Sequence, residues 1–430
     1  MELTHGLEDR PGLGRLLLYG LQWTLLTLPI LTVSTNLAAD FLGYDQAMRT
    51  ALGQRFLILI GLTMIFQGTL GHRLPLVDGP AGALLLCLIT LAPSGEAVVR
   101  GSLMAGGAIL ALAAHLGLLK RIEPLFSRDM VGVVVLLIAF TILPFLLPLV
   151  LDRGPAAPLG RPWAAVTAVG LTLLIPALGH WLKGFPRSLS VLMALVLGTF
   201  LFGVMGRLEL GRIAAAPWLG WPLPFPTGPP RLSVAGLTAA CLAYFVLLAN
   251  LKGSLAGVQE VVGGGRSQAR TRRGAAVSGW AGVLAGAAGG YGPVAYALSP
   301  GVILSTGVGS RWTTVSAGGL ILGLGFCSKM AAALAVVPGP VVAAAMIASM
   351  AAQIGTGLSI LTKGGRELAG RDYFVIGLPL LLGTLSSLLP REFISLLPPL
   401  IGPLAGNGLV VGLISLVLLE WVVLRKGNLP

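Results

Sequence analysis

The stretch Tyr291-Gly-Pro-Val-Ala-Tyr-Ala-Leu-Ser-Pro-Gly301 interrupts the most continuously apolar half of the chain. Its glycines and prolines break a helix and leave backbone N–H and C=O groups unpaired, which hydrocarbon cannot satisfy. At membrane depth such a break persists only against protein or a water-filled cavity. A second break, Arg73-Leu-Pro-Leu-Val-Asp-Gly-Pro80, lies in the first half of the chain. Paired breaks in two halves of a membrane chain indicate a binding site between them.

The composition is that of a polytopic membrane protein. Of the 430 residues, 55% are hydrophobic and 10% are charged, so the chain lacks the polar surface that a soluble protein of this length needs. The net charge of +13 comes from bases spread singly between apolar runs, which argues against nucleic-acid binding. Cys87, Cys241 and Cys327 lie far apart inside apolar segments, so we expect neither disulfides nor a metal cluster.

The sequence contains no pattern that indicates catalysis. His72, His115 and His180 are scattered near the ends of apolar runs, without Ser-His-Asp, His-Glu or Cys-His spacing, and there is no phosphate-binding loop. We therefore expect no enzyme activity, no cofactor and no metal.

An all-α fold with fourteen transmembrane segments is predicted, taking about 20 apolar residues per span. The spans are expected at residues 16–38, 52–70, 76–93, 102–119, 130–150, 163–182, 188–206, 233–257, 274–290, 295–309, 312–328, 332–361, 372–390 and 404–425. The third and tenth, which contain the two breaks, are short. The polar connection from Arg207 to Arg231 divides the chain into two halves of seven spans each.

The distribution of Lys and Arg predicts the orientation. Eighteen of the 29 lie on the side of both termini, ten on the other side, and Lys252 falls inside the eighth span. This bias places both termini in the cytoplasm of a cell that carries the protein in its inner, or plasma, membrane. Because each half has an odd number of spans, the second half runs in the opposite direction, as a 7+7 inverted repeat. Half-helices at the breaks would then aim their positive N-terminal dipoles at a substrate.

Four regions of the sequence carry a family resemblance. They are Leu7-Glu-Asp-Arg-Pro11 with Tyr19-Gly-Leu-Gln-Trp23, Gly71-His-Arg-Leu-Pro-Leu-Val-Asp-Gly79, residues 126–132, and Gly301-Val-Ile-Leu-Ser-Thr-Gly-Val-Gly-Ser-Arg-Trp312 with residues 318–340. In these regions the chain resembles the nucleobase/ascorbate transporter family, which contains the uracil and xanthine permeases. The resemblance implies a core domain of spans 1 to 4 and 8 to 11, a gate domain of spans 5 to 7 and 12 to 14, and a homodimer.

The implied division of the chain follows from these spans. Residues 1–15 form a cytoplasmic N-terminus, 16–119 and 233–328 the two parts of the core domain, 120–206 and 329–425 the two parts of the gate domain, 207–232 the loop between the repeats, and 426–430 a C-terminal tail.

The chain departs from the family at several site positions. Members that couple uptake to protons place a glutamate in the eighth span, where this chain has Asn250, and a second acid or amide in the tenth, where it has Leu298 or Ser299. The histidine that follows Gln22 in the family is Trp23 here, and the aromatic residue of the third span falls at Gly82. The usual proton-coupling glutamate is therefore missing.

A nucleobase presents an edge of alternating donors and acceptors, which amides, hydroxyls and backbone groups can match. Asn250 and Ser254 lie four residues apart on one helical face and could hold a ring stacked on Tyr296. Alternatively, they bond a neighbouring helix, as polar residues in membrane bundles often do. The substrate-binding candidates are Asn250, Ser254, Tyr296, Ala297, Leu298, Ser299, Gly79, Gly82, Gln22 and Trp23.

Two charged residues are further candidates. Asp78 is an acid at the mouth of a broken span and would carry a coupling ion, H⁺ or Na⁺, although Asp78-Gly79-Pro80 also fits the start of a helix, with Asp78 as its cap. Lys252 lies about 200° around the helix from Asn250. It would either extend its ammonium to the membrane surface or form an ion pair, or else replace a coupling proton or neutralise an anionic substrate.

The sequence therefore predicts a secondary transporter, active or facilitative, for a nucleobase such as uracil or xanthine, working by movement of the core against the gate. The alternative is an anion transporter on the related sulfate/bicarbonate-type fold, which the missing acids, Lys252 and the half-helix dipoles favour. A third class, a receptor or scaffold that transports nothing, would be expected to have a sizeable soluble domain, and the sequence shows none.

Overall fold

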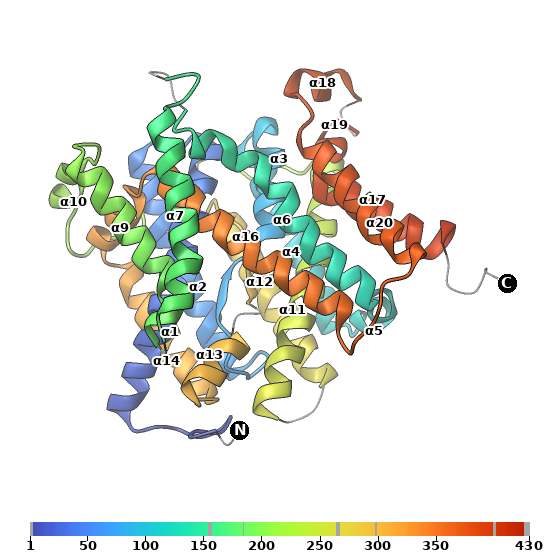
Figure 1. The fold of residues 1–430 in the computed structure, drawn as a ribbon, viewed down its shortest axis with the longest axis horizontal. Helices are drawn as coiled ribbons and strands as arrows, with labels where there is room; N and C mark the ends of the chain where they lie inside the picture. The colour runs from blue at the N-terminus through green and yellow to red at the C-terminus, as the bar shows by residue number, and fades with distance from the viewer. Residues whose placement is uncertain are drawn as a thin grey trace.

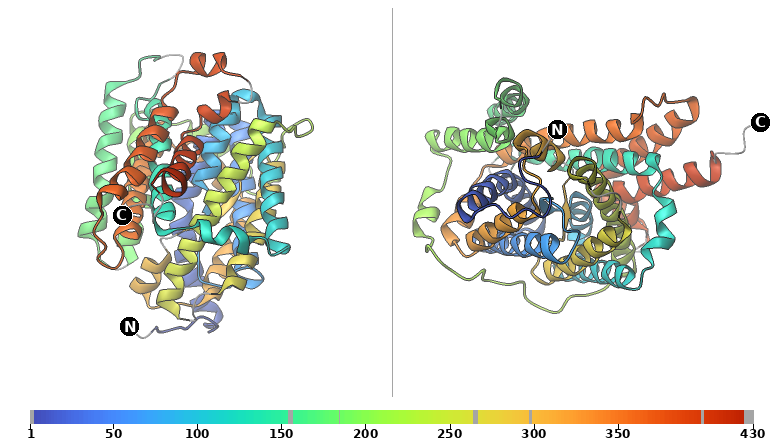
Figure 2. Two further views of the ribbon diagram at one scale, coloured as in Figure 1. Left: turned by 90° about the vertical axis from the view of Figure 1, so that its right-hand side faces the viewer. Right: turned by 90° about the horizontal axis from the view of Figure 1, so that it is seen from below.

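The computed structural model describes residues 3–153, 157–183, 185–263, 267–296, 299–398 and 401–424. Two site candidates, Ala297 and Leu298, lie outside these residues. Most of the chain forms helices that run side by side (Figures 1 and 2). Seven of the described helices are each long and apolar enough to cross a membrane alone, which agrees with a polytopic membrane protein.

The first half of the chain has seven main segments. They are α1 (Leu13–Leu42), α2 (Gln46–Thr69), the strand β1 (Asp78–Pro80) followed by α3 (Gly82–Leu91), α4 (Glu96–His115), α6 (Arg128–Val150), α7 (Pro162–Trp181) and α9 (Ser190–Val204). The short α5 (Leu119–Ile122) connects α4 to α6, α8 (Phe185–Ser188) precedes α9, and α10 (Leu210–Ala215) follows α9.

The second half repeats this order. Its segments are α11 (Val234–Val262), α12 (Gln268–Ala287), the strand β2 (Pro293–Ala295) followed by α13 (Ser299–Thr306), α14 (Arg311–Gly325), α16 (Gly339–Thr362), α17 (Gly370–Ser387) and α20 (Gly408–Leu418). Short helices α15 (Ser328–Ala335), α18 (Arg391–Leu396) and α19 (Gly402–Ala405) lie between them. Each predicted span coincides with one of the main segments.

Three predicted span boundaries need correction. The third and tenth spans begin as extended strands, and their helices start only at Gly82 and Ser299. The twelfth span was predicted from residue 332, but the helix starts at Gly339. Residues 328–335 instead form α15, which bends by 88° from α14. The helix cannot run through Val337-Pro-Gly-Pro340 because proline lacks the N–H and clashes with the preceding turn.

The pairing of helices follows an inverted repeat. In the order of spans, α2 packs against α14 as the second against the eleventh, and α4 packs against α12 as the fourth against the ninth. These two pairs exchange places when the halves are exchanged. The fifth and twelfth spans, α6 and α16, pack against each other, as do the two strands of the third and tenth. Seven spans in each half therefore occupy equivalent positions.

Close backbone contact at glycine joins the equivalent pairs. A Cβ added to Gly61 of α2 would lie 2.6 Å from the carbonyl oxygen of Gly318 in α14. Between α4 and α12, a Cβ on either Gly107 or Gly279 would lie 2.7 Å from the other's carbonyl oxygen. Small residues of this kind drive helix association in membranes, where the hydrophobic effect between helices is absent.

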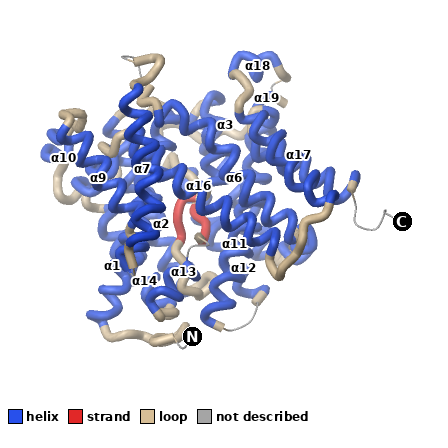
Figure 3. Tube along the Cα trace, viewed as in Figure 1, coloured by secondary structure: helices blue, strands red, loops and turns tan. Residues whose placement is uncertain are grey.

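The two sequence breaks meet at the centre of the molecule, where Figure 3 shows the only strands of the described chain. β1 and β2 pair antiparallel, with Asp78 opposite Ala295 and Pro80 opposite Pro293. The backbone N–H of Tyr296 donates to the carbonyl of Val77 at 2.8 Å, and that of Ala81 donates to Gly292 at 3.0 Å. The exposed backbone of one break thus satisfies the other, which confirms that the breaks form one unit.

A buried ion network joins α6 to α17. Asp129 lies in the first turn of α6 and Asp372 in the first turn of α17, with side chains 3% and 8% exposed. Arg366, in the connection before α17, pairs with Asp129 and, at 2.8 Å, with Asp372. The hydrogen bond to Asp129 raises the pKa of Arg366 above its ordinary value, since both carboxylates favour its charged form.

We expect Arg366→Ala to lower the free energy of unfolding by about 3 kcal/mol, because it removes a base that two buried carboxylates share. Thermal unfolding of the purified protein in detergent measures the change. Lys183→Ala, at an exposed base after α7, is the control and should change stability by less than about 0.5 kcal/mol. Equal effects of the two substitutions would contradict a structural role for the network.

The close packing at the strand crossing leads to a second prediction, which concerns a substitution of Gly79. The phenol ring of Tyr296 covers this glycine so closely that an added Cβ would lie 2.2 Å from its Cε2 atom. Gly79→Ala should therefore displace Tyr296 and lower the free energy of unfolding by on the order of 2 kcal/mol. The unfolding temperature should fall by several degrees. Gly301→Ala, where an added Cβ meets no atom within 4 Å, should leave the temperature unchanged. A neutral Gly79→Ala would mean that the crossing tolerates a side chain.

Candidate functional site

The candidate site is organised by the crossing of the two strands. Immediately after it, α3 begins at Gly82 and α13 begins at Ser299. The N-termini of two helices therefore lie beside the crossing, with backbone N–H groups that no helical carbonyl satisfies. Their dipoles favour negative charge or electron-rich oxygen atoms at this place.

Asn250 lies on the face of α11 that turns toward this crossing. On the same face, a Cβ added to Gly257 would lie 3.3 Å from Pro300 of α13, and one added to Gly253 would lie 3.9 Å from Val131 of α6. Asn250 is half-buried, and its amide makes no side-chain hydrogen bond to any residue that the structure describes. Its donor and acceptor groups are available to a ligand between α6, α11 and α13.

Ser254 has a structural role instead. Its hydroxyl is 1% exposed and donates to the carbonyl of Ala295 at 2.8 Å. The one donor of Ser254 holds β2 against α11, so its partner is a strand and not the neighbouring helix of the alternative.

Ser299 likewise holds the two breaks together. It is fully buried, its Oγ accepts from the backbone N–H of Val77 at 3.1 Å, and it donates to the carbonyl of Tyr296 at 3.1 Å. Both of these bonds lie within the crossing, and the role of Ser299 in substrate binding stays a prediction.

Tyr296 is anchored at both ends. Its hydroxyl donates to the carbonyl of Pro80 at 2.7 Å, and its ring lies on Gly79. The residue is half-buried, so the predicted stacking of a ring against it stays a prediction.

Gln22 and Trp23, the two site candidates of the first span, differ in their surroundings. Trp23 is 3% exposed, and its Nε1–H donates to Thr313 Oγ1 of α14 at 3.1 Å. It therefore packs α1 against α14, and its contact with a substrate stays a prediction. Gln22 is half-buried on α1, and its role stays a prediction.

Gly82, at the start of α3, contacts α6 through a residue that the sequence analysis did not propose for the site. A Cβ added there would lie 3.0 Å from Cγ2 of Ile138 in α6, so Ile138 packs directly against this glycine. Ile138 and Val131 belong to a continuous apolar run. No periodicity or polarity signal distinguishes them from lipid-facing neighbours.

Asp78 is the unusual residue of the crossing. It is fully buried, and within the described chain neither carboxylate oxygen has a hydrogen-bond partner. The alternative that it caps a helix is wrong, because α3 starts four residues later, after Ala81, with no side-chain cap. A buried carboxylate without a partner costs several kcal/mol if it is charged, so Asp78 remains the candidate for taking up a proton or a cation.

Lys252 does not belong to this face. Its ammonium lies 5.1 Å from the centre of the Phe126 ring, on the side of α11 turned away from Asn250, as the predicted 200° separation requires. It is therefore separate from the candidate substrate site.

Comparison with known proteins places this geometry in a family. The Permease family model (Xan_ur_permease) matches residues 14–392. The uric acid transporter UacT of Escherichia coli (strain K12) is 24% identical, over 95% of this chain and 86% of its own length. The uric acid permease PucK of Bacillus subtilis (strain 168) is 25% identical, over 85% and 86%. A xanthine permease of the same bacterium is 23% identical, over 96% and 94%.

Solved structures of anion transporters share the fold. The transmembrane domain of a cyanobacterium bicarbonate transporter, BicA, superposes with a TM-score of 0.62 at 15% identity, covering 97% of this chain and all of that one. Murine Slc26a9 in its inward-facing state gives a TM-score of 0.63 at 13% identity, covering 96% and 69%. At such identities the likeness concerns the 7+7 inverted-repeat fold alone. With a model match that spans residues 14–392, the chain belongs to the Permease family of membrane transporters.

Proposed function

We propose that this protein is a secondary transporter for a nucleobase of the oxidised purine type, with uric acid and xanthine as the first candidates and uracil as a smaller one. One observation carries the proposal: the amide of Asn250 is available beside the crossing where α3 and α13 begin. An amide can pair with one donor and one acceptor on the edge of a planar base. The named purine relatives support the same substrate class.

The helix N-termini add a preference for electron-rich ligands. Urate is an anion at neutral pH, and xanthine presents carbonyl oxygens, so both match the positive ends of α3 and α13. No glutamate lies at the position of Asn250. A neutral amide there lowers the repulsion of an anionic base, which favours urate.

We propose that transport occurs by movement of a core group of helices, α1 to α4 and α11 to α15, against a gate group, α6 to α9 and α16 to α20. Glu260 at the end of α11 and Lys363 after α16 form a salt bridge of 2.6 Å between the groups, with side chains 57% and 58% exposed. Exposed pairs of this kind contribute little to stability. This contact can therefore break and reform as the groups move.

We also propose that both termini face the cytoplasm and that the protein forms a homodimer. An added Cβ on Gly309 would contact both Leu3 and Val262, so the N-terminal segment and the connection from α11 to α12 lie on one side of the molecule. The first turns of α12, directly after that connection, contain Arg270, Arg272 and Arg273, which supports cytoplasmic termini.

Counterflow in proteoliposomes tests the substrate class. Vesicles loaded with unlabelled solute should accumulate labelled urate or xanthine, and labelled sulfate or bicarbonate should remain at background. Uptake of sulfate without uptake of any nucleobase would replace the proposal with the anion transporter of similar fold.

We expect Asn250→Ala to lower purine uptake at least about tenfold, since removing one partner of a buried hydrogen bond costs about 1–3 kcal/mol. The control is Thr238→Ala, an exposed position on the same helix, which should keep uptake within about twofold. Competition by unlabelled substrate reports whether binding is lost. Equal effects of the two substitutions would show that this face of α11 does not contact the substrate.

Asp78 is our proposed coupling group. Its buried carboxylate would take up a proton or Na⁺ together with the substrate and release both on the other side. Asp78→Asn should abolish stimulation of uptake by an imposed pH or Na⁺ gradient while counterflow exchange continues, because the amide cannot titrate. Glu209→Gln, at a surface acid paired with Arg212, should retain the stimulation. Persistent stimulation in Asp78→Asn would exclude Asp78 as the coupling group.

A further inference from the structure

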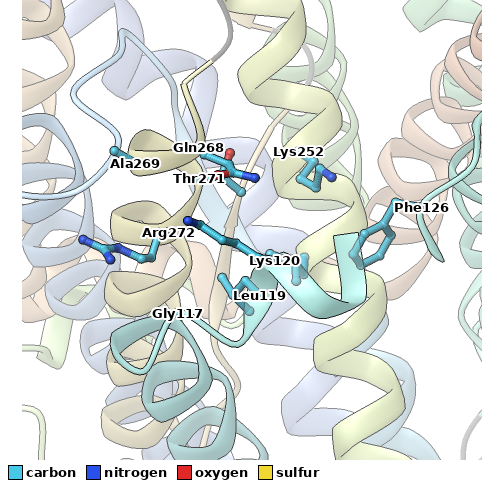
Figure 4. A pocket seen from close by; sticks show the side chains of 10 residues that line it. Gly117, Leu119, Lys120, Phe126, Lys252, Gln268, Ala269, Thr271 and Arg272 are labelled. Carbon is cyan, nitrogen blue, oxygen red and sulfur yellow. The ribbon is translucent and has the colours of Figure 1, made fainter. Parts of the chain in front are cut away.

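A hollow of about 350 Å³ lies at the surface of the molecule, between α2, the end of α14 and the connection from α10 to α11. Its described wall consists of apolar side chains alone, which are Ile58, Trp221, Pro222, Leu223, Phe225 and Phe326. Another hollow, of about 330 Å³, lies between α11, the start of α12 and the connection from α4 to α6. Its wall includes Lys120 and Lys252, and Arg272 points away from it (Figure 4). The purely apolar hollow suits a hydrocarbon occupant, because it offers no partner to a polar group.

Four of the residues that line the apolar hollow belong to one extended segment, residues 216–231, which we call the belt. The belt contains neither helix nor strand, and the right-hand view of Figure 2 shows this yellow-green segment along the edge of the helix bundle. Three buried side chains of α2 and α4 donate hydrogen bonds to its carbonyl groups. The pairs are Gln54 with Gly220 at 3.1 Å, Arg55 with Pro224 at 2.7 Å and Arg100 with Gly228 at 3.1 Å. The belt is therefore bound to two helices of the core group.

Large apolar side chains of the belt point away from the protein. Trp218, Trp221 and Leu223 are 73%, 75% and 63% exposed, whereas the intervening Pro222 is buried. Exposed apolar patches mark contact surfaces, and in membrane proteins tryptophan is enriched at the level of the headgroups. The outward face of the belt therefore matches the interface between lipid and water.

The backbone of the belt also suits a poorly hydrated place. Six of its sixteen residues are prolines, which have no N–H group to satisfy. The N–H of Gly220 donates to the carbonyl of Phe326 at 3.0 Å. The N–H of Arg231 donates to the carbonyl of Ala97 at 2.8 Å. No Asp or Glu occurs from residue 210 to residue 232. The belt therefore has few polar groups that would lose water among lipid headgroups.

The belt lies on the side of the molecule opposite to the N-terminal segment. It contacts α2 at Arg55, in the first half of this helix, and α14 at its end, through Phe326. The N-terminal segment lies at the other ends of the same two helices. Arg311, at the start of α14, donates to the carbonyl of Leu7 and, at 2.6 Å, to that of Gly68 near the end of α2. With the N-terminus in the cytoplasm, the belt is at the outer surface of the membrane.

The apolar hollow extends from the belt toward the middle of a membrane span. Its wall includes Ile58, the thirteenth of the 24 residues of α2, which is long and apolar enough to cross a membrane alone. At 1.5 Å per residue, Ile58 lies about 18 Å from the start of this helix. A half-buried residue at that depth faces hydrocarbon and not water. The occupant that fits this position is the acyl chain of a membrane lipid.

We propose that the belt anchors the protein in the leaflet opposite to the N-terminal segment. Trp218 and Trp221 lie among the headgroups of this leaflet, and an acyl chain of a phospholipid occupies the hollow as far as Ile58. Because the carbonyls of the belt are bonded to α2 and α4, the anchor acts on the core group and not on the gate group. The contact with lipid is independent of the substrate that is transported.

Quenching of tryptophan fluorescence tests the anchor in proteoliposomes that contain the full chain. The contribution of the belt is the difference between the unsubstituted protein and Trp218→Phe with Trp221→Phe, which keeps an aromatic side chain at both exposed positions. Phosphatidylcholine brominated near the glycerol end of its acyl chains should quench this contribution at least about twofold more than aqueous iodide does, because tryptophan at the headgroup level contacts the lipid.

The control is the contribution of Trp23, which is 3% exposed and is obtained in the same way from Trp23→Phe. Neither quencher should affect it. Stronger quenching of the belt by iodide would place its tryptophans in water, and quenching by neither agent would place them against protein, such as a second copy of the chain. Either result would overturn the anchor.

The occupant of the hollow is tested separately with Phe326→Trp, which exchanges one aromatic side chain for another in the protein that already carries Trp218→Phe and Trp221→Phe. Phosphatidylcholine brominated in the middle of its acyl chains should quench the added fluorescence more strongly than iodide does, because the hollow reaches Ile58 inside the span. Fluorescence that no brominated lipid quenches would show that no acyl chain enters the hollow.

Discussion

Extended backbone at the centre of a membrane protein must satisfy its polar groups within the protein, and this requirement shapes the molecule. β1 and β2 meet it by pairing with each other. The pairing brings residues more than two hundred positions apart into contact and, because it is antiparallel, sets the N-termini of α3 and α13 at opposite ends of the strand pair. The hydroxyls of Ser254 and Ser299 form hydrogen bonds that fix the two breaks in place. The site is therefore rigid in its backbone, and few side chains remain for a ligand.

The helices around the crossing are held by close approach and not by large side chains. Reciprocal glycine contacts join α2 to α14 and α4 to α12, pairs that the repeat makes equivalent. The same kind of glycine contact therefore joins both equivalent helix pairs. Outside this group, α6, α16 and α17 pack together and are joined by the network of Arg366 with Asp129 and Asp372.

The polar residues of the broken spans look alike in sequence and differ in role. Asn250 makes no side-chain hydrogen bond to any residue that the structure describes, whereas Ser254 is bonded to β2 one helical turn later on the same face. Asp78 is buried without a hydrogen-bond partner among the described residues, and Lys252 points to a separate hollow beside exposed leucines. Substrate recognition and ion coupling are thus proposed for two different residues, and Lys252 is separate from both.

The sequence by itself determined the membrane class, the order of the spans and the two breaks, because hydrophobic length, glycine and proline act locally. It also predicted the separation of Lys252 from Asn250, since helical geometry fixes angles within one element. Only the tertiary structure decided that Asp78 caps no helix, that Trp23 bonds Thr313 in α14, and that Ile138 fills the space above Gly82. These facts depend on atoms contributed by other elements, and the pattern of one segment does not encode its neighbours.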